Sequence, residues 1–129
     1  MSEALKLLAG RLRDEDTPIS PHVTDPPDRC AAANLSAEQD FVVEAVREGY
    51  LLHYGEPRLL SGHDDDLALL AGDYLYALGI ERLATLGDTE AVRALADLIS
   101  ASAQLHAEGR EGEAPGRWRE AVHAIGTGA

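Results

Sequence analysis

Apolar residues recur at helical spacing along much of the chain, and the clearest repeat lies in residues 36–53. Its apolar positions follow one another at intervals of three and four, which is the period of one helical face. Ser36 and Gln39 form a capping-box pattern at its start, and Gly55 with Pro57 stops it. The pattern predicts a helix over this stretch.

The run from Leu67 to Leu83 is apolar on nearly every side. In a protein outside the membrane, this pattern is typical of a central helix that other helices surround. Shorter repeats predict three more helices, over residues 2–13, 88–107 and 117–125. Together these elements predict an all-α fold, a single-domain bundle of about five helices over residues 1–129.

Two stretches interrupt the helical pattern. Residues 14–34 hold four of the six prolines, so we expect a surface connector without a regular helix. Residues 109–116, GREGEAPG, are expected to form a flexible loop.

Composition narrows the range of partners. A net charge of -12 opposes binding to nucleic acid or to an anionic lipid surface. Cys30 is the only cysteine, which is typical of a reducing compartment, and no run is long enough for a membrane span. Without a signal-peptide pattern at the N-terminus, we expect a cytoplasmic location.

Three consecutive aspartates, Asp64, Asp65 and Asp66, stand directly before the long apolar run. Carboxylates at a helix N-terminus stabilise the helix by about 0.3–1 kcal/mol each. A Mg²⁺ site that also holds a diphosphate requires carboxylates four residues apart on one face, whereas the residues four positions after these aspartates are apolar. We interpret the three aspartates as a helix cap, and we predict no catalytic or metal-binding residue.

Asp73 lies within the apolar run, where a charge is costly unless it is paired or hydrogen-bonded. We expect a buried polar residue with a structural partner. Gly72 beside it lowers helix stability by about 1 kcal/mol relative to alanine, which indicates close approach of another helix. His53 and His106 could each act as a base, but single histidines near helix ends are more often structural.

The run ALLAGDYLYALGIERLATLGDTEAVRALADLISASAQLHAEG, residues 68–109, resembles the middle of the all-α trans-isoprenyl (polyprenyl) diphosphate synthases. In that family a buried LAGDYLLA-like helix is followed by a Gly-Asp turn and by a helix that ends in Glu-Gly. The resemblance covers about a third of the chain.

The chain departs from this family at its catalytic motifs. Family enzymes bind Mg²⁺ and an allylic diphosphate through two DDxxD motifs, the first on the helix before the GDYL helix and the second much later. Neither motif occurs here, and the arginine pair that follows the first is missing. The resemblance therefore implies no cofactor for this chain, because any Mg²⁺ would be bound by a partner.

A short all-α chain without these motifs is similar to the small subunit of heterodimeric hexaprenyl and heptaprenyl diphosphate synthases. Such a subunit associates with a catalytic polyprenyl diphosphate synthase subunit and helps to set product chain length. Because family dimers form largely through helices around the GDYL region, the resemblance implies five interface candidates, which are Tyr74, Leu78, Val92, Leu95 and Ile99.

Other functions remain open at this point. A self-associating domain that has kept the fold would form a homodimer and have no enzymatic role. A stand-alone enzyme would need a site that the sequence does not reveal, and a cavity between the helices could instead hold a lipid-like ligand.

Overall fold

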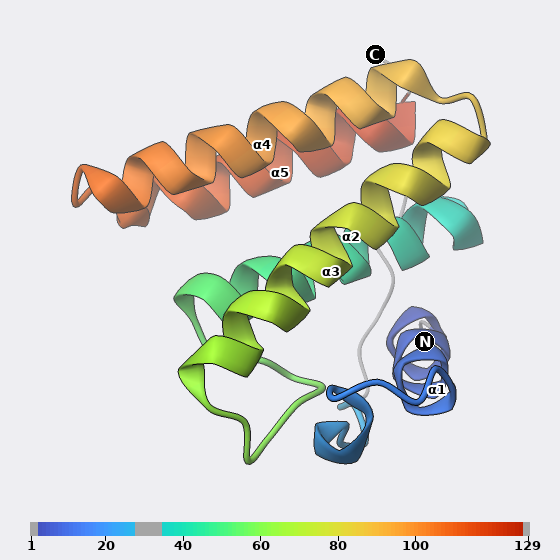
Figure 1. Ribbon diagram of the computed structural model, residues 1–129. Coiled ribbons are helices and arrows are strands. Elements are labelled where there is room, and N and C mark those ends of the chain that lie inside the picture. Colours follow the sequence, from blue (N-terminus) through green and yellow to red (C-terminus); the bar gives the residue numbers. More distant parts are fainter. Residues whose placement is uncertain (1–2, 28–34, 128–129) are drawn as a thin grey trace.

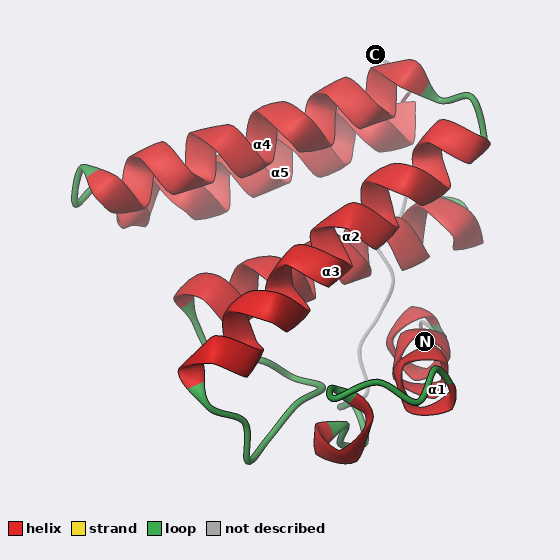
Figure 2. Ribbon diagram, viewed as in Figure 1, coloured by secondary structure: helices red, strands yellow, loops and turns green. Residues whose placement is uncertain are grey.

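The computed structural model describes residues 3–27 and 35–127, and almost all of the regular structure within these ranges is helical (Figures 1 and 2). The five α-helices are α1 (Ala4–Asp14), α2 (Ala37–Tyr54), α3 (Asp65–Thr85), α4 (Thr89–Ala107) and α5 (Ala114–Thr127). Two short 3-10 helices, η1 (Ser20–His22) and η2 (Glu111–Glu113), lie in the connections. These elements confirm the prediction of an all-α, single-domain bundle of about five helices.

Side-chain caps fix where α2 and α4 begin. The Ser36 hydroxyl accepts a hydrogen bond from Gln39 N at 3.1 Å, and the Gln39 side chain accepts one from Ser36 N at 2.9 Å, so the predicted capping box is present. Asp88 caps α4 by accepting from Ala91 N at 3.2 Å. Both starts are within one residue of the predicted positions.

The pair α2 and α3 forms the centre of the fold, and glycines allow the two helices to approach closely. A Cβ atom added to Gly72 would lie 2.3 Å from His53 Nε2, and one added to Gly79 would lie 2.6 Å from Val46 Cγ2. A Cβ atom on Gly49 would lie 2.9 Å from the carbonyl oxygen of Gly72. The interpretation of Gly72 as a packing glycine therefore agrees with the structure.

Two apolar clusters lie at different parts of this central pair. One joins α1 and the segment around Ile19 to α2 and α3, and the other joins α2 and α3 to the α4–α5 hairpin. The hairpin and α1 are accordingly far apart in Figure 1, with α2 and α3 between them. No helix in residues 3–27 and 35–127 is long and apolar enough to cross a membrane.

The segment predicted as a surface connector over residues 14–34 is partly incorporated into the core. Ile19 is buried, and η1 follows it directly. Val23 pairs with Leu60 in an isolated antiparallel bridge, and Thr24 N donates to Leu59 O at 2.7 Å. The prolines exclude a long helix, but they do not prevent apolar side chains in the segment from packing inward. Cys30 lies outside the described residues.

The prediction of a flexible loop over residues 109–116 is wrong. This stretch contains η2, and α5 begins at Ala114 instead of residue 117. Pro115 lies in the first turn of α5, where its missing N–H has no partner to lose and its fixed φ suits the helix.

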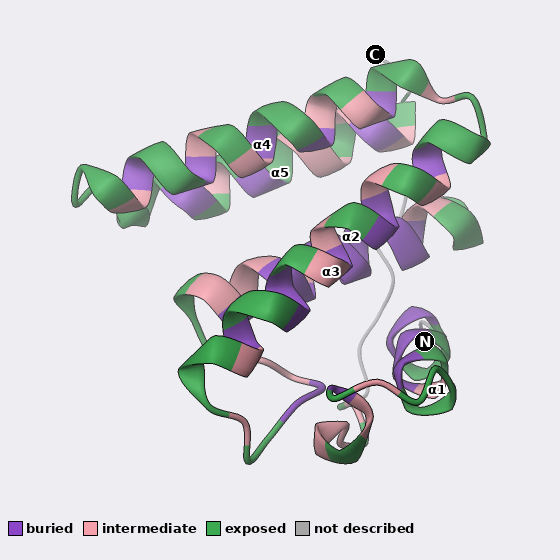
Figure 3. Ribbon diagram, viewed as in Figure 1, coloured by how far each residue is buried: buried purple, intermediate pink, exposed green. Residues whose placement is uncertain are grey.

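The expectation that α3 is surrounded by other helices is also wrong. Its side facing α2 is buried, whereas Leu69 and Leu70 are each 55% exposed. Buried and exposed segments alternate along this helix in Figure 3. An apolar residue at the surface costs little by itself, so an apolar sequence on all sides does not ensure burial on all sides.

Candidate functional site

The most deeply buried charges of the described residues lie on α2. Glu44 and Glu48 are four residues apart, face the same side of the helix and are almost completely inaccessible to solvent. Asp40 is buried one turn earlier. The charged partner of the two glutamates is Arg58, which lies in the loop between α2 and α3.

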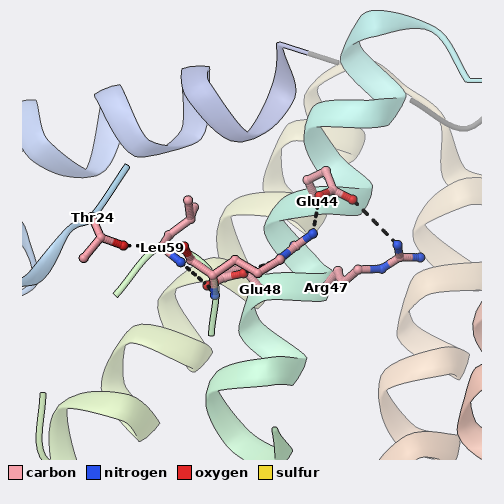
Figure 4. A network of polar contacts seen from close by, with 6 residues as sticks. Thr24, Glu44, Arg47, Glu48 and Leu59 are labelled. Carbon is pink, nitrogen blue, oxygen red and sulfur yellow. Dashed lines mark hydrogen bonds and ion pairs between the residues drawn. The ribbon is translucent and has the colours of Figure 1, made fainter. Parts of the chain in front are cut away.

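Arg58 links both carboxylates. Figure 4 shows Glu48 beside Leu59 and Glu44 beside Arg47 in the same network. Its Nη1 donates to Glu44 Oε2 at 2.8 Å, and its Nε donates to Glu48 Oε1 at 3.0 Å. The other oxygen of Glu48 accepts from the backbone N–H groups of Arg58 at 2.6 Å and Leu59 at 2.8 Å. Glu48 thus accepts three hydrogen bonds, as a buried carboxylate requires.

This network also connects the loop to the N-terminal segment. Leu59 N donates to Glu48, and the carbonyl oxygen of the same residue accepts from Thr24 N. Arg47 Nη1 lies 3.9 Å from Glu44 Oε1 on the opposite side of the network, and its guanidinium lies 5.2 Å from the centre of the Trp118 ring in α5. Contacts around Glu44 and Glu48 therefore reach from residue 24 to α5.

The chemistry available to the two glutamates is limited by these contacts. A pair of carboxylates one turn apart has the spacing of a Mg²⁺ ligand pair, but here a guanidinium lies against both carboxylates. A cation could reach them only by displacing Arg58 and breaking the hydrogen bonds that hold the loop. Residues 3–27 and 35–127 contain no group of three or more His, Cys, Asp or Glu side chains arranged to hold a metal ion.

Aromatic and histidine side chains gather where the end of α2 meets α3, α4 and α5. Tyr50 Oη shares a hydrogen bond with His106 Nε2 at 2.7 Å, and the Tyr54 ring stacks on the His106 ring at 4.0 Å. The Trp118 ring meets Tyr50 edge-on at 5.4 Å. These contacts give His106 a packing and hydrogen-bonding role between the α2 end and the α4–α5 hairpin.

The pKa values of two tyrosines in this cluster, Tyr50 and Tyr76, are shifted away from what a base requires. Burial raises the pKa of Tyr50, and burial is also the main cause that raises the pKa of Tyr76, whose ring lies 5.1 Å from that of His53. A raised phenol pKa favours the neutral form, whereas a tyrosine base requires a lowered one. The cluster is thus arranged for packing.

The aspartates at the start of α3 lie where the capping interpretation assigns them. Asp64 is the N-cap residue, and its side chain accepts from Leu67 N at 2.8 Å. Asp65 and Asp66 lie in the first turn and are exposed. Their negative charges face the positive end of the helix.

The expectation that Asp73 is a buried polar residue is wrong, because its side chain is 76% exposed. It lies at the solvent-exposed edge of the α2–α3 contact, where His53 Nε2 of α2 is 3.3 Å from Asp73 Oδ1. Water solvates the carboxylate, so it requires no buried partner.

The five interface candidates do not form an exposed surface in this chain. Leu78 and Leu95 are buried in its core, so the structure contradicts their assignment to an interface. Tyr74, Val92 and Ile99 are partly buried and pack against the two clusters, and the Tyr74 hydroxyl donates to Glu15. The same helical periodicity that marks an interface also marks an internal face, and these positions serve the internal one.

No protein-family model, curated protein or solved structure matches this chain in comparisons with each set.

Sequence reasoning missed the Glu44, Glu48 and Arg58 network. Glu44 and Glu48 are four residues apart, the spacing that a Mg²⁺ ligand pair requires and that Asp64–Asp66 lack. This spacing is the one feature of the sequence that indicates a carboxylate pair on α2. Their burial was not readable from it, because the same spacing occurs on any solvated helix face. The partner, ten residues beyond Glu48, lies across a loop whose path the sequence pattern does not define.

Proposed function

We propose that this chain is the non-catalytic small subunit of a heterodimeric polyprenyl diphosphate synthase, supporting a catalytic partner chain and influencing product chain length. The observation that carries the proposal is the pairing of Glu44 and Glu48 with Arg58. It gives a physical reason why a chain that resembles this family would not bind the metal and diphosphate itself.

The argument depends on the order of the helices. In the enzymes that the sequence resembles, the first DDxxD motif lies on the helix before the GDYL helix, which corresponds here to α2 preceding α3. The glutamates of α2 have the required spacing, but their negative charge is directed to an internal arginine. A Mg²⁺ ion bridging to a diphosphate needs carboxylates that are open to solvent and substrate.

The same pairing supports a scaffold role for α2. Because Glu48 binds the loop that leads into α3, the charges that would face a substrate instead hold the connection between the central helices. Under this proposal the partner chain supplies the metal ligands and the substrate site, while this chain supplies a folded surface.

Two incorporation assays test the proposal. The purified chain, incubated with Mg²⁺, an allylic diphosphate and labelled isopentenyl diphosphate, is expected to form no product. The tagged chain, captured from lysate of the cells that encode it, is expected to bring with it a chain carrying two DDxxD motifs and to show incorporation that neither chain has alone. Capture with the tag alone is the control.

Two results would contradict the proposal. Product formation by the purified chain would make it an enzyme and would contradict the non-catalytic assignment. Recovery of the bait alone, as an inactive homo-oligomer, would favour the self-associating domain instead.

A further inference from the structure

One face of α3 is exposed along the length of the helix in the structure of residues 3–27 and 35–127. Its positions recur at intervals of three and four, so they lie on one stripe. We refer to this stripe, which is exposed throughout, as the α3 outer stripe: Asp66, Leu70, Asp73, Ala77, Glu81 and Ala84. Carboxylates and apolar side chains alternate along it, turn by turn.

The carboxylates of the stripe have little compensating charge. Among the described residues, Asp66 and Glu81 form no ion pair, and the basic side chain near Asp73 is His53 at 3.3 Å. The one basic side chain of α3, Arg82, is directed to Glu38 on α2 at 3.1 Å and lies over the Phe41 ring. The stripe therefore presents negative charge together with apolar surface.

This charge pattern disfavours a second copy of the chain as the occupant. A twofold interface is self-complementary, with the same patch on both sides. Two α3 outer stripes packed on each other would bring together only acidic and apolar side chains, with no basic side chain on either stripe to pair with the carboxylates. The net charge of -12 on each copy adds to the repulsion.

From this pattern we infer that the α3 outer stripe docks a helix of a different chain, one that presents lysine or arginine side chains about two turns apart beside a leucine-rich ridge. The basic side chains pair with Asp66, Asp73 and Glu81, and the ridge covers Leu70 and Leu69 at its flank. The inference rests on the proposed function in one respect, which is that the chain binds a different partner chain. It predicts a heterodimer and not a homodimer.

The test uses two synthetic helical peptides with leucines at intervals of three and four. One carries lysine beside the leucines, and the other carries glutamate at the same positions. Fluorescence anisotropy measures their binding to the whole chain at low and high salt. The lysine peptide is expected to bind, more weakly at high salt, and the glutamate peptide is not.

Matched variants locate the binding. Asp73→Lys with Glu81→Lys is expected to weaken lysine-peptide binding by about tenfold or more. Asp97→Lys with Glu120→Lys makes the same change of charge on exposed positions of α4 and α5, and it is expected to change binding by less than about twofold. Circular dichroism verifies that both variants are folded.

Three outcomes would overturn the inference. They are equal weakening by both charge variants, equal binding of the two peptides, and a homodimer that Leu70→Ser dissociates. Failure of the proposed function is separable. If the Asp73→Lys, Glu81→Lys variant still supports full prenyl incorporation with the captured partner, only the docking surface is wrong. If the lysine peptide binds at the stripe but no incorporation occurs, only the synthase assignment is wrong.

Discussion

Replacement of Glu48 by alanine is the most direct test of how this fold is held together. The side chain is 0% exposed and accepts three hydrogen bonds, two from backbone N–H groups of the loop and one from the Arg58 guanidinium. Alanine removes the acceptor, leaves the N–H groups of Arg58 and Leu59 without their partner, and leaves Arg58 with Glu44 alone.

The size of the effect follows from the cost of buried groups that lose their partners. Hydrogen bonds to a charged acceptor each contribute about 1.5–3 kcal/mol, and these contributions do not add fully when they share one carboxylate. Removing one member of a buried ion pair costs about 3–5 kcal/mol. We expect Glu48→Ala to lower the free energy of unfolding by about 3–5 kcal/mol, a large part of the roughly 5–15 kcal/mol typical of a domain.

Urea unfolding measures this loss, followed by circular dichroism for the helices and by Trp118 fluorescence for the α4–α5 side. Glu56→Ala is the matched control, because it removes a glutamate from an exposed position of the loop that Glu48 binds. It is expected to change stability by less than about 0.5 kcal/mol.

A conservative variant separates charge from hydrogen bonding. Glu48→Gln keeps one acceptor oxygen for the two backbone N–H groups but places an NH₂ group against the Arg58 guanidinium, so an intermediate loss is expected. The reasoning would be refuted by a cost below about 1 kcal/mol for Glu48→Ala, or by equal costs for Glu48→Ala and Glu56→Ala.

Three further predictions concern the helices around this network. Gly49→Ala is expected to destabilise the chain by about 1–3 kcal/mol, because the new Cβ meets the Gly72 carbonyl. A Cβ on Gly10 would have nothing within 4 Å, so Gly10→Ala is expected to stabilise the chain by about 0.5–1 kcal/mol. Equal effects of the two variants on urea unfolding would contradict the close helix crossing. Asp64→Ala is expected to cost about 0.5–2 kcal/mol and Asp64→Asn less, by thermal unfolding, because asparagine retains an acceptor for Leu67 N; equal losses would remove the capping argument. Burial raises the pKa of Tyr76, so the stability that its neutral phenol contributes is complete below the unfolded pKa of about 10 and is lost as pH rises above that value. Tyr76→Phe should make the free energy of unfolding less dependent on pH in that alkaline range. An unchanged slope would contradict the raised pKa of Tyr76.

The starts and ends of the helices were predictable because their signals are local. A capping box, a capping aspartate or a glycine acts within a few residues, so Ser36 and Asp88 mark the starts of α2 and α4 whatever the rest of the chain does. The start of α5 is not marked by a local signal of this kind, because Gly and Pro occur in loops as well as in the first turn of a helix, where Pro115 lies here.

Which charges are buried was not predictable, because burial depends on partners that are distant in sequence. Asp73 sits in a highly apolar run yet is exposed, and Glu44 and Glu48 sit in an ordinary amphipathic pattern yet are buried. Periodicity defines the faces of a helix, but a loop or a second helix determines which face is covered. On α2, Arg58 covers the face that carries Glu44 and Glu48, and its position follows from the path of residues 55–60.

The buried and the exposed carboxylates lie on different helices, α2 and α3. α2 is enclosed by α1, α3, α5 and the loop at residues 55–60, so its buried carboxylates Glu44 and Glu48 require internal donors and obtain them from that loop. α3 packs chiefly on α2, so its carboxylates remain hydrated and keep their charge available. Glu44 and Glu48 are thus neutralised inside the fold, whereas the carboxylates of the α3 outer stripe remain open to a basic partner, as the docking inference requires.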